Sequence, residues 1–248
     1  MNEHQNGSIR WLSFPLLDDA GMHHGIFQRQ GGSSRVPYDS LNTSFEVQDK
    51  ALHVQSNVNR ITELLGIDQC ITMRQRHTRS VQSVTPQSNS IIDCCDGLIT
   101  HHSRLGLLSL HADCQPALFF DPVEKVLANV HCGWRGNVLD IYGETVRNLC
   151  ALGCKPANIL VGIGPSLGPC HAEFINYKKE LPIAFWDFQV KPNHFDLWAI
   201  SRYQLETAGI LPHHIHCANI CTYSNAKNWY SYRRERTTGR NATLACLS

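Results

Sequence analysis

The sequence predicts an α+β fold, in which mixed β-sheets flanked by helices form a layered α/β sandwich. Strand-like apolar runs and segments of helical periodicity both occur, but they do not alternate strictly along the chain. That order disfavours a doubly wound parallel sheet, which needs regular alternation. Composition is even from end to end, without repeats, low-complexity tracts or long linkers, and this predicts a single compact domain over residues 1–248.

Apolar runs bounded by turn residues predict the strands. The chain opens with such a run at 9–17, and a second begins at residue 25 and becomes a loop rich in Gly, Ser and Pro. Further runs lie at 70–77, 80–84, 105–112, 115–120, 125–133 and 159–166. Residues 228–247 are expected to form a strand, a basic turn and a final strand.

Three segments have the periodicity of helices. Residues 51–66 place their apolar side chains on one helical face, and Gly66 provides a stop signal. Residues 137–153 repeat this pattern and end at Gly153, while residues 197–210 predict a late helix. These helices supply the flanking layers of the predicted sandwich.

The charge balance is nearly neutral and limits the kinds of partner. Lys and Arg number 22 against 21 acidic residues, a formal charge of +1, so we expect neither nucleic acid nor a membrane surface as partner. The N-terminus lacks the basic-then-apolar pattern of a signal peptide, and no apolar run is long enough to span a bilayer. We therefore expect a cytoplasmic protein whose 11 cysteines are mostly reduced thiols.

His77, Cys114 and His131 each lie at or near the end of a predicted strand. Nitrogen and sulfur ligands suit zinc, and a catalytic zinc site keeps three protein ligands with a fourth position for water. The three residues are far apart in sequence, so they would have to converge from separate strands. Their chemistry alone also fits a buried core cysteine and two structural histidines.

Six motifs favour the metal site over the structural interpretation: "RQRHTRSV", "DGLIT", "HADCQPALFFDP", "NVHCGWRGN", "GIGPSLGPCHAEF" and "YSYRRERTTGR". In this order they resemble the laccase-domain family, also called the multicopper polyphenol oxidoreductase or zinc-dependent purine nucleoside phosphorylase family. The resemblance covers roughly residues 20 to 245, and an N-terminal stretch, "RQGGSSRVPYDSLNTSF", also matches. It implies one metal site whose His, Cys and His ligands fall on His77, Cys114 and His131.

The resemblance implies purine nucleoside chemistry with one zinc ion as cofactor. Members phosphorolyse adenosine, guanosine, inosine and methylthioadenosine, and they hydrolytically deaminate adenosine. The expected partners are therefore a purine nucleoside and phosphate. The resemblance also implies a monomer or a weak homodimer. Copper is the less expected metal, because a blue-copper site usually has an axial Met and the chain has only three methionines.

Several polar residues within the motifs are candidates for supporting roles. With Cys114 and His131, Asp113 is assigned to catalysis, either as a general base that orients water or as an acid that supports the ligands. Arg29 precedes two glycines and is a candidate phosphate or substrate contact. Asn42 is either a second substrate contact or a structural cap.

Three further candidates follow the same motifs. Arg135 is expected at a helix entrance, where it binds an anion or forms a salt bridge. Arg233 belongs to a basic run that is either a solvated face or a phosphate contact. Cys170, between Gly-Pro turns, is expected to form a wall of the substrate pocket, with Glu173 as a polar contact.

The chain departs from the family pattern at three positions. His111 replaces a Thr, Cys132 replaces an Ala, and Ala172 replaces an aromatic residue. Strand alternation should point Cys132 away from the face of His131. Ala172 should leave more room near the pocket or remove a stacking contact there. A separate His/Cys-rich stretch at 211–221 is interpreted as a structural surface turn before a strand.

Three other functions remain open at this point. The first is copper-dependent oxidation of polyphenols. The second is cysteine hydrolase or amidase chemistry that edits cell-wall precursors, with Cys114 as nucleophile. The third is a metal-bound interaction module without catalysis.

Overall fold

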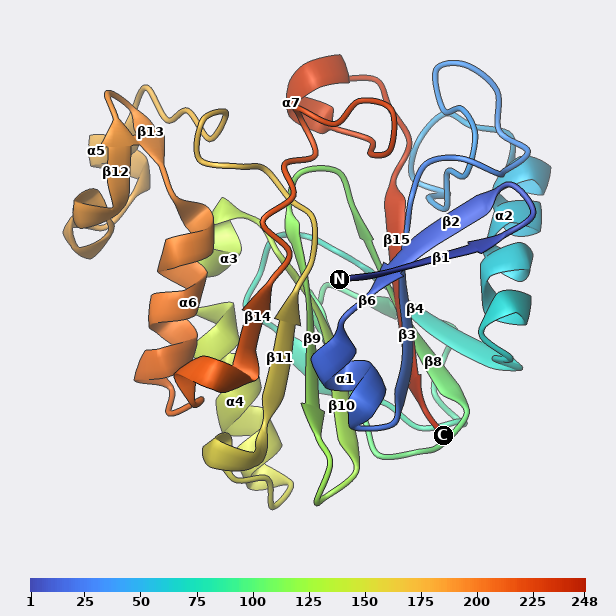
Figure 1. Ribbon diagram of the computed structural model, residues 1–248, viewed down its shortest axis with the longest axis horizontal. Coiled ribbons are helices and arrows are strands. Elements are labelled where there is room, and N and C mark those ends of the chain that lie inside the picture. Colours follow the sequence, from blue (N-terminus) through green and yellow to red (C-terminus); the bar gives the residue numbers. More distant parts are fainter.

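The computed structural model describes residues 1–248. Two β-sheets pack face to face, and helices cover their outer faces (Figure 1). Each sheet is mixed, with both antiparallel and parallel neighbours. The predicted α+β class with mixed, helix-flanked sheets is therefore confirmed.

The first sheet has seven strands and contains both ends of the chain. In spatial order they are β1 (Asn2–Asn6), β2 (Ile9–Ser13), β3 (Met22–Phe27), β15 (Asn241–Leu247), β8 (Leu105–His111), β4 (Gln69–Arg74) and β6 (Ile91–Asp93). The final strand of the chain thus lies between an early strand and a central one. This places residues near the C-terminus beside the middle of the sequence.

The second sheet has six strands. In spatial order they are β14 (Ile215–Cys217), β11 (Leu160–Ile163), β9 (Gln115–Asp121), β10 (Val126–Cys132), β7 (Gly97–Thr100) and β5 (Val81–Ser83). A small separate ribbon pairs β12 (Gln189–Lys191) with β13 (His194–Phe195).

Helices occupy the outer layers and the loops. They are α1 (Pro15–Asp19), α2 (Ala51–Leu64), α3 (Trp134–Val138), α4 (Ile141–Ala151), α5 (Tyr177–Glu180), α6 (Leu197–Thr207) and α7 (Tyr232–Glu235). Short 3₁₀-helices are η1 (Pro156–Asn158), η2 (Ile183–Phe188) and η3 (Pro212–His214). None of these helices combines the length and the apolar character needed to cross a bilayer.

The central strands are apolar on both faces because both faces are covered. Every residue of β9 and β10 is buried. In β9, Leu118 and Phe120 pack into the core between the sheets, whereas Phe119 faces the opposite way, toward α4. Such strands are continuous apolar runs rather than alternating ones. This explains why the predicted strands at 115–120 and 125–133 agree with β9 and β10.

The outer helices use the apolar faces that their periodicity predicts. Helix α2 packs Ile61 against the first sheet, and α4 packs Val146 and Leu149 against the second (Figure 1). Helix α6 lies beside α4 and contributes Leu205 to the same core. The molecule therefore has four layers: α2, the first sheet, the second sheet, and the pair α4 and α6.

The predicted opening strand at 9–17 is a strand only as far as Ser13, because α1 begins at Pro15. Two further predicted segments also differ from the structure. Residues 137–153 do not form one helix, because α3 ends at Val138 and Asp140, with a left-handed φ of 55°, begins α4 as its N-cap. At the C-terminal end, β15 is present but no strand precedes it. Instead Ser231 accepts a hydrogen bond from the backbone N–H of Arg234 and caps α7. Both differences come from side-chain caps that override the apolar pattern.

A buried amide joins the two sheets. Asn129 of β10 donates hydrogen bonds of 2.8 Å to the carbonyl oxygens of Leu107 in β8 and Thr243 in β15. Its side-chain oxygen accepts a 2.7 Å hydrogen bond from Ser109. The side chain is fully buried, so these contacts satisfy groups that water cannot reach. They fix how β10 lies over β8 and β15.

Replacing this amide tests its contribution to the sandwich. We expect Asn129→Leu to lower the free energy of unfolding by about 2–4 kcal/mol, because it leaves buried carbonyl and hydroxyl groups without partners. Chemical denaturation measures the loss, and Asn59→Leu on the exposed side of α2 is the control. Equal stability of the two variants would contradict this assignment.

Candidate metal centre and pocket

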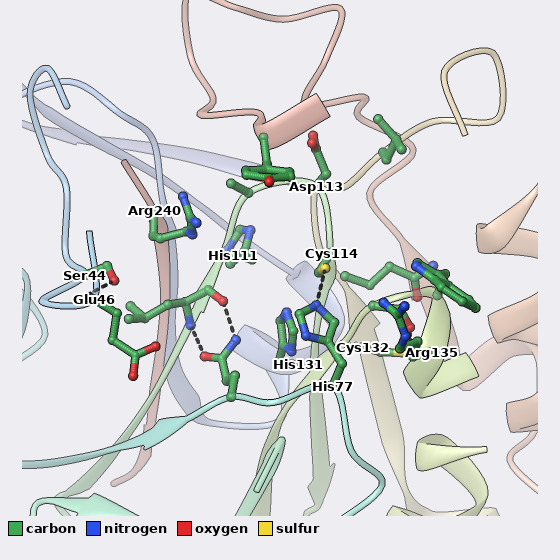
Figure 2. Close-up of a pocket in the computed structure, with 18 of the residues that line it drawn as sticks. Ser44, Glu46, His77, His111, Asp113, Cys114, His131, Cys132, Arg135 and Arg240 are labelled. Carbon is green, nitrogen blue, oxygen red and sulfur yellow. Dashed lines mark hydrogen bonds between the residues drawn. The ribbon is translucent and has the colours of Figure 1, made fainter. Parts of the chain in front are cut away.

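The three predicted metal ligands lie together at one end of the sandwich (Figure 2). Cys114 lies in the short link where the chain passes from β8 of the first sheet to β9 of the second. His131 is the next-to-last residue of β10. His77 follows β4 and has a left-handed φ of 58°. Two sheets therefore have to pack correctly before the three side chains can meet.

The geometry of the three side chains fits a zinc ion. One ligand atom from each of His77, Cys114 and His131 lies within 4.8 Å of the others. The distance from Cys114 Sγ to His77 Nε2 is 3.7 Å. Tetrahedral zinc with a Zn–S bond of about 2.3 Å and a Zn–N bond of about 2.1 Å separates these atoms by about 3.6 Å. Two imidazoles and a thiolate can therefore hold a metal ion here.

Gly133 leaves the space that this centre needs. A Cβ atom at this position would lie 2.6 Å from His77 Cδ2 and 3.0 Å from Cys114 Sγ. Real Cβ atoms do not approach other heavy atoms so closely. The glycine of the "HCGW" motif thus lets the His77 ring lie directly against the backbone after β10.

Asp96 connects two of the ligands, and the sequence analysis did not identify it. Its Oδ1 atom accepts a 2.9 Å hydrogen bond from His131 Nδ1 and a 3.0 Å bond from the backbone N–H of His77. Its Oδ2 atom accepts bonds from the backbone N–H groups of Arg76 and Thr78 and from the Thr78 hydroxyl. The sequence feature that could have identified Asp96 is its position directly before the buried strand β7, in "DGLIT".

The charges of this cluster stabilise one another. Burial would raise the pKa of the Asp96 carboxyl, but the hydrogen bond and charge of His131 and the bonds from Thr78 lower it to about 2. Burial would likewise raise the pKa of the Cys114 thiol, but His131 and His77 lower it to about 6. For His131, burial is outweighed by Cys114 and Asp96, and its pKa rises to about 9. Because of the lowered pKa, Cys114 is mainly a thiolate at neutral pH, which is the form that binds a metal ion.

The centre opens into a pocket of about 990 Å³ between the ends of the two sheets. Aromatic side chains line it, namely Phe45, Trp134, Phe174 and Tyr232. Its charged residues outside the metal centre are Glu46, Asp113 and five arginines, Arg74, Arg135, Arg233, Arg236 and Arg240. Aromatic walls and excess positive charge suit a planar ring together with an anion.

Asp113 lines the pocket, but its carboxylate is already occupied. Its Oδ1 accepts a 2.6 Å hydrogen bond from the Thr222 hydroxyl, and its Oδ2 accepts a 2.6 Å bond from the backbone N–H of Arg233. Figure 2 shows the carboxylate turned away from Cys114. Asp113, predicted as either a general base or a supporting acid, thus holds α7 at the rim of the pocket.

Of the five expected substrate contacts, two line the pocket. Arg135 lies with its guanidinium carbon 4.3 Å from the centre of the Trp134 ring. Arg233 donates a 3.1 Å hydrogen bond to the carbonyl oxygen of Glu173. Neither guanidinium pairs with a carboxylate within 4.0 Å, so both charges remain available to a ligand.

The structure does not bring Arg29, Asn42 or Cys170 into the pocket. Arg29 pairs with Glu235 at 3.0 Å and lies over the Tyr230 ring, so its charge is used inside the protein. Asn42 is fully buried and hydrogen-bonded on both side-chain atoms. Cys170 is exposed on a surface turn. For Arg29 and Asn42, partners about 200 residues away determine where the side chains lie.

The three departures from the family pattern have different consequences. Cys132 points into the core beneath α4, as strand alternation predicts. His111 points between the sheets, and its Nε2 atom lies 3.0 Å from the Thr243 hydroxyl. Ala172 does not widen the pocket: it is fully buried in the cluster that contains Phe174 and Phe195. The expectation of extra room at Ala172 is wrong, because neighbouring aromatic side chains fill that space.

The 211–221 stretch forms a 3₁₀ turn and the edge strand β14. His213 and His214 pack ring against ring with their centres 4.4 Å apart. The structure gathers three or more potential metal ligands only at His77, Cys114 and His131.

Fold and site together define a two-sheet α+β protein with one His₂Cys cluster that could hold a metal ion in a large pocket. The chain belongs to the multi-copper polyphenol oxidoreductase laccase family, whose model matches residues 23–248. It is 34% identical over 235 residues to "Purine nucleoside phosphorylase SCO2081" of Streptomyces coelicolor, covering 92% of this chain and 96% of that protein. It is 30% identical to "Purine nucleoside phosphorylase YlmD" of Bacillus subtilis, covering 87% and 85%.

Solved structures share the whole fold. Bacillus licheniformis protein YfiH superposes with a TM-score of 0.90 at 27% identity, over 99% of both chains. YlmD from Geobacillus stearothermophilus superposes with a TM-score of 0.89 at 28% identity, over 99% of this chain and 98% of that one. The two-sheet architecture is therefore a property of these relatives as well.

Asp96 can be tested as the support of the metal ligands. We expect Asp96→Asn to weaken zinc binding about 10–100-fold, because the His131 ring and the His77 backbone lose their shared anionic partner. Competition with a chromophoric chelator measures the affinity. Asp93→Asn, at an exposed pair with Arg74, is the control, and unchanged affinity in Asp96→Asn would exclude the role.

The pKa of Cys114 gives a second test in metal-free protein. Because this pKa is lowered to about 6, the thiolate predominates above pH 6 and is lost as the pH falls below it. The alkylation rate of Cys114 by iodoacetamide should therefore reach half its maximum near pH 6, against about 8.5 in unfolded protein. His131→Asn should move the midpoint upward. Identical midpoints in folded and unfolded protein would contradict the predicted charge coupling.

Proposed function

We propose that the protein is a zinc-dependent purine nucleoside enzyme. It phosphorolyses adenosine, guanosine, inosine and methylthioadenosine, and it hydrolytically deaminates adenosine. The observation that carries this proposal is the His77, Cys114 and His131 centre, which opens into an aromatic and cationic pocket. Similarity to proteins named purine nucleoside phosphorylase over about nine-tenths of the chain supports the substrate class.

The chain's own residues determine which metal suits the centre. His77, Cys114 and His131 would hold one zinc ion, and a bound zinc supplies a Lewis acid that polarises an oxygen and acidifies water. Asp96 fixes the ring orientation of His131 so that Nε2 is free for the ion. Several copper ions would need more ligands than this one cluster provides. We therefore propose zinc rather than copper.

Binding and orientation are assigned to the pocket walls. Exposed aromatic faces at Phe45 and Tyr232 offer surfaces against which a purine ring can stack. Arg135 and Arg233 supply donors to the ribose or to phosphate from the side of α3 and α7. Asp113 holds the backbone of Arg233 in place at 2.6 Å. Its contribution is therefore to position the rim and not to transfer a proton.

One experiment tests metal, ligands and substrate together. Wild type should contain about one zinc per chain by plasma mass spectrometry. It should convert adenosine to adenine only when phosphate is present, and to inosine in either case. Cys114→Ala should lose zinc and at least about 100-fold of both activities, because the centre loses its thiolate ligand.

The matched control is Cys154→Ala, which removes a buried thiol far from the pocket. It should keep both zinc and activity. Copper in place of zinc, or absence of any purine product from metal-loaded wild type, would overturn the proposal.

A second function is favoured by one specific arrangement. His131 lies between Cys114 and Asp96, with its Nδ1 atom 2.9 Å from the carboxylate, in the order of a cysteine hydrolase triad. In that case Cys114 is a nucleophile, and amide hydrolysis of cell-wall precursors would continue after zinc removal. Chelation followed by assay of both substrate classes separates the two functions.

A further inference from the structure

Arg240 places an uncompensated positive charge at the pocket. Its Nη1 atom donates hydrogen bonds of 2.9 Å and 3.1 Å to the carbonyl oxygens of Thr238 and Gly239. Its guanidinium carbon lies 5.9 Å from the centre of the Tyr232 ring. All three partners are neutral, and no carboxylate oxygen lies within 4.0 Å. A guanidinium is always charged in proteins, so a partly buried one favours a bound anion.

The protein itself neutralises two other arginines of this region. Arg29 pairs with Glu235 at 3.0 Å, and Arg74 pairs with Asp93 at 2.7 Å. Arg240 differs from these two because its guanidinium has no carboxylate partner and its Nε and Nη2 atoms make no hydrogen bond to the protein. Figure 2 shows this guanidinium directed across the pocket toward the side of His111. A free N–H edge of this kind matches a tetrahedral oxyanion.

The electrostatic surroundings of Arg240 are consistent with a charge that lacks a full partner in the protein. Burial lowers the pKa of the Arg240 guanidinium, and the opposing effect of Cys114, Asp113 and Glu46 does not fully offset it.

Asn42 holds Arg240 in this position. The backbone N–H of Arg240 donates a 2.9 Å hydrogen bond to Asn42 Oδ1, from 198 residues away in sequence. The Asn42 amide in turn donates a 2.9 Å bond to the Asp49 carboxylate. The hydroxyl of Thr43 donates a 3.1 Å bond to the carbonyl oxygen of Arg240. Both backbone polar groups of Arg240 are thus fixed by the 42–43 segment.

Gly239 makes this close approach possible. A Cβ atom there would lie 2.7 Å from the Tyr230 ring and 3.0 Å from Asn42. A side chain at this position would separate the two segments and turn the next residue away. The "SLNTSF" and "TTGR" stretches are therefore one structural unit, although the sequence separates them widely.

We propose that Arg240 binds the inorganic phosphate consumed in phosphorolysis and that Asn42 is the positioning residue that holds it. This rests on the proposed function, which requires an oxyanion as co-substrate. In the reaction a phosphate oxygen bonds to ribose C1′ as the bond from C1′ to the purine nitrogen breaks. The electron pair of that bond goes to the base, which takes up a proton from solvent. Arg240 neutralises the attacking anion and takes no part in the proton transfer.

The test compares the two activities of zinc-loaded protein. Arg240→Gln should raise the KM for phosphate in inosine phosphorolysis at least about tenfold, because the phosphate loses its ionic partner. Deamination of adenosine in phosphate-free buffer should change less than about threefold. Arg240→Lys keeps the positive charge but not the two parallel N–H donors of the guanidinium, so its KM for phosphate should lie between those of wild type and Arg240→Gln. Asn42→Ala should raise the same KM while leaving deamination nearly unchanged.

Calorimetric titration with inorganic phosphate gives a readout that is independent of turnover. Wild type and Arg147→Gln, which removes an exposed arginine paired with Glu144, should bind phosphate equally. Arg240→Gln should bind at least about tenfold more weakly. Melting temperatures identify any variant that fails to fold. If Arg240→Gln fails to fold, phosphate binding by Arg240→Lys is compared with that of wild type instead.

The outcomes separate this inference from the proposed function. Absence of purine turnover in zinc-loaded wild type overturns the proposed function, while the calorimetry still reports on Arg240. Unchanged phosphate binding in Arg240→Gln, or a parallel fall of phosphorolysis and deamination, overturns the role of Arg240 even when wild type is active. An unchanged KM in Asn42→Ala overturns the positioning role alone.

Discussion

The buried carboxylate of Asp96 is the interaction on which the site depends. A desolvated carboxylate is costly unless its lone pairs are filled. Here three backbone N–H groups, one hydroxyl and one imidazole fill them. Because the backbone donors follow β4 and the imidazole belongs to β10, one anion joins a loop of the first sheet to a strand of the second. It also stabilises the left-handed backbone at His77, which a non-glycine residue adopts only with support from its surroundings.

The sandwich supplies the second constraint, since the ligands converge only when the two sheets hold a fixed register. The apolar core between the sheets gives most of the stabilisation, but apolar contacts have no preferred direction. Asn129 adds direction, because its amide must meet carbonyl oxygens of β8 and β15 together. Cys114 follows β8 in the first sheet and directly precedes β9 in the second. The hydrogen bonds of Asn129 in the middle of the sandwich therefore help to fix the positions of Cys114 and His131 at its end.

Local patterns in the sequence were sufficient for much of the fold. Helix α2 and strands β8, β9 and β10 have strong periodicity or long apolar runs, and the sequence predicts them well. The caps at Asp140 and Ser231 were missed because a single hydrogen bond outweighs the apolar pattern there. The ligand residues were predicted by motif resemblance, since wide spacing alone is equally compatible with structural residues. Arg29 and Asn42 lie outside the pocket for one reason: each is held by a partner about 200 residues away, namely Glu235 and Arg240.

The arginines show why residue type is insufficient to assign function in this pocket. A paired arginine such as Arg29 has its charge matched inside the protein and serves as a structural link. Arg135, Arg233 and Arg240 line the pocket with no carboxylate within 4.0 Å of the guanidinium group, so each favours an anion from solution. Pairing is decided by tertiary contacts and not by the local motif, because "RQGG" and "TTGR" look equally suited to bind phosphate. Figure 2 shows the side chains of His77, Cys114 and His131 between Arg240 on one side and Arg135 on the other. Guanidinium groups without a carboxylate partner therefore flank the ligand cluster, and an anion bound by either one would lie beside the metal-binding residues.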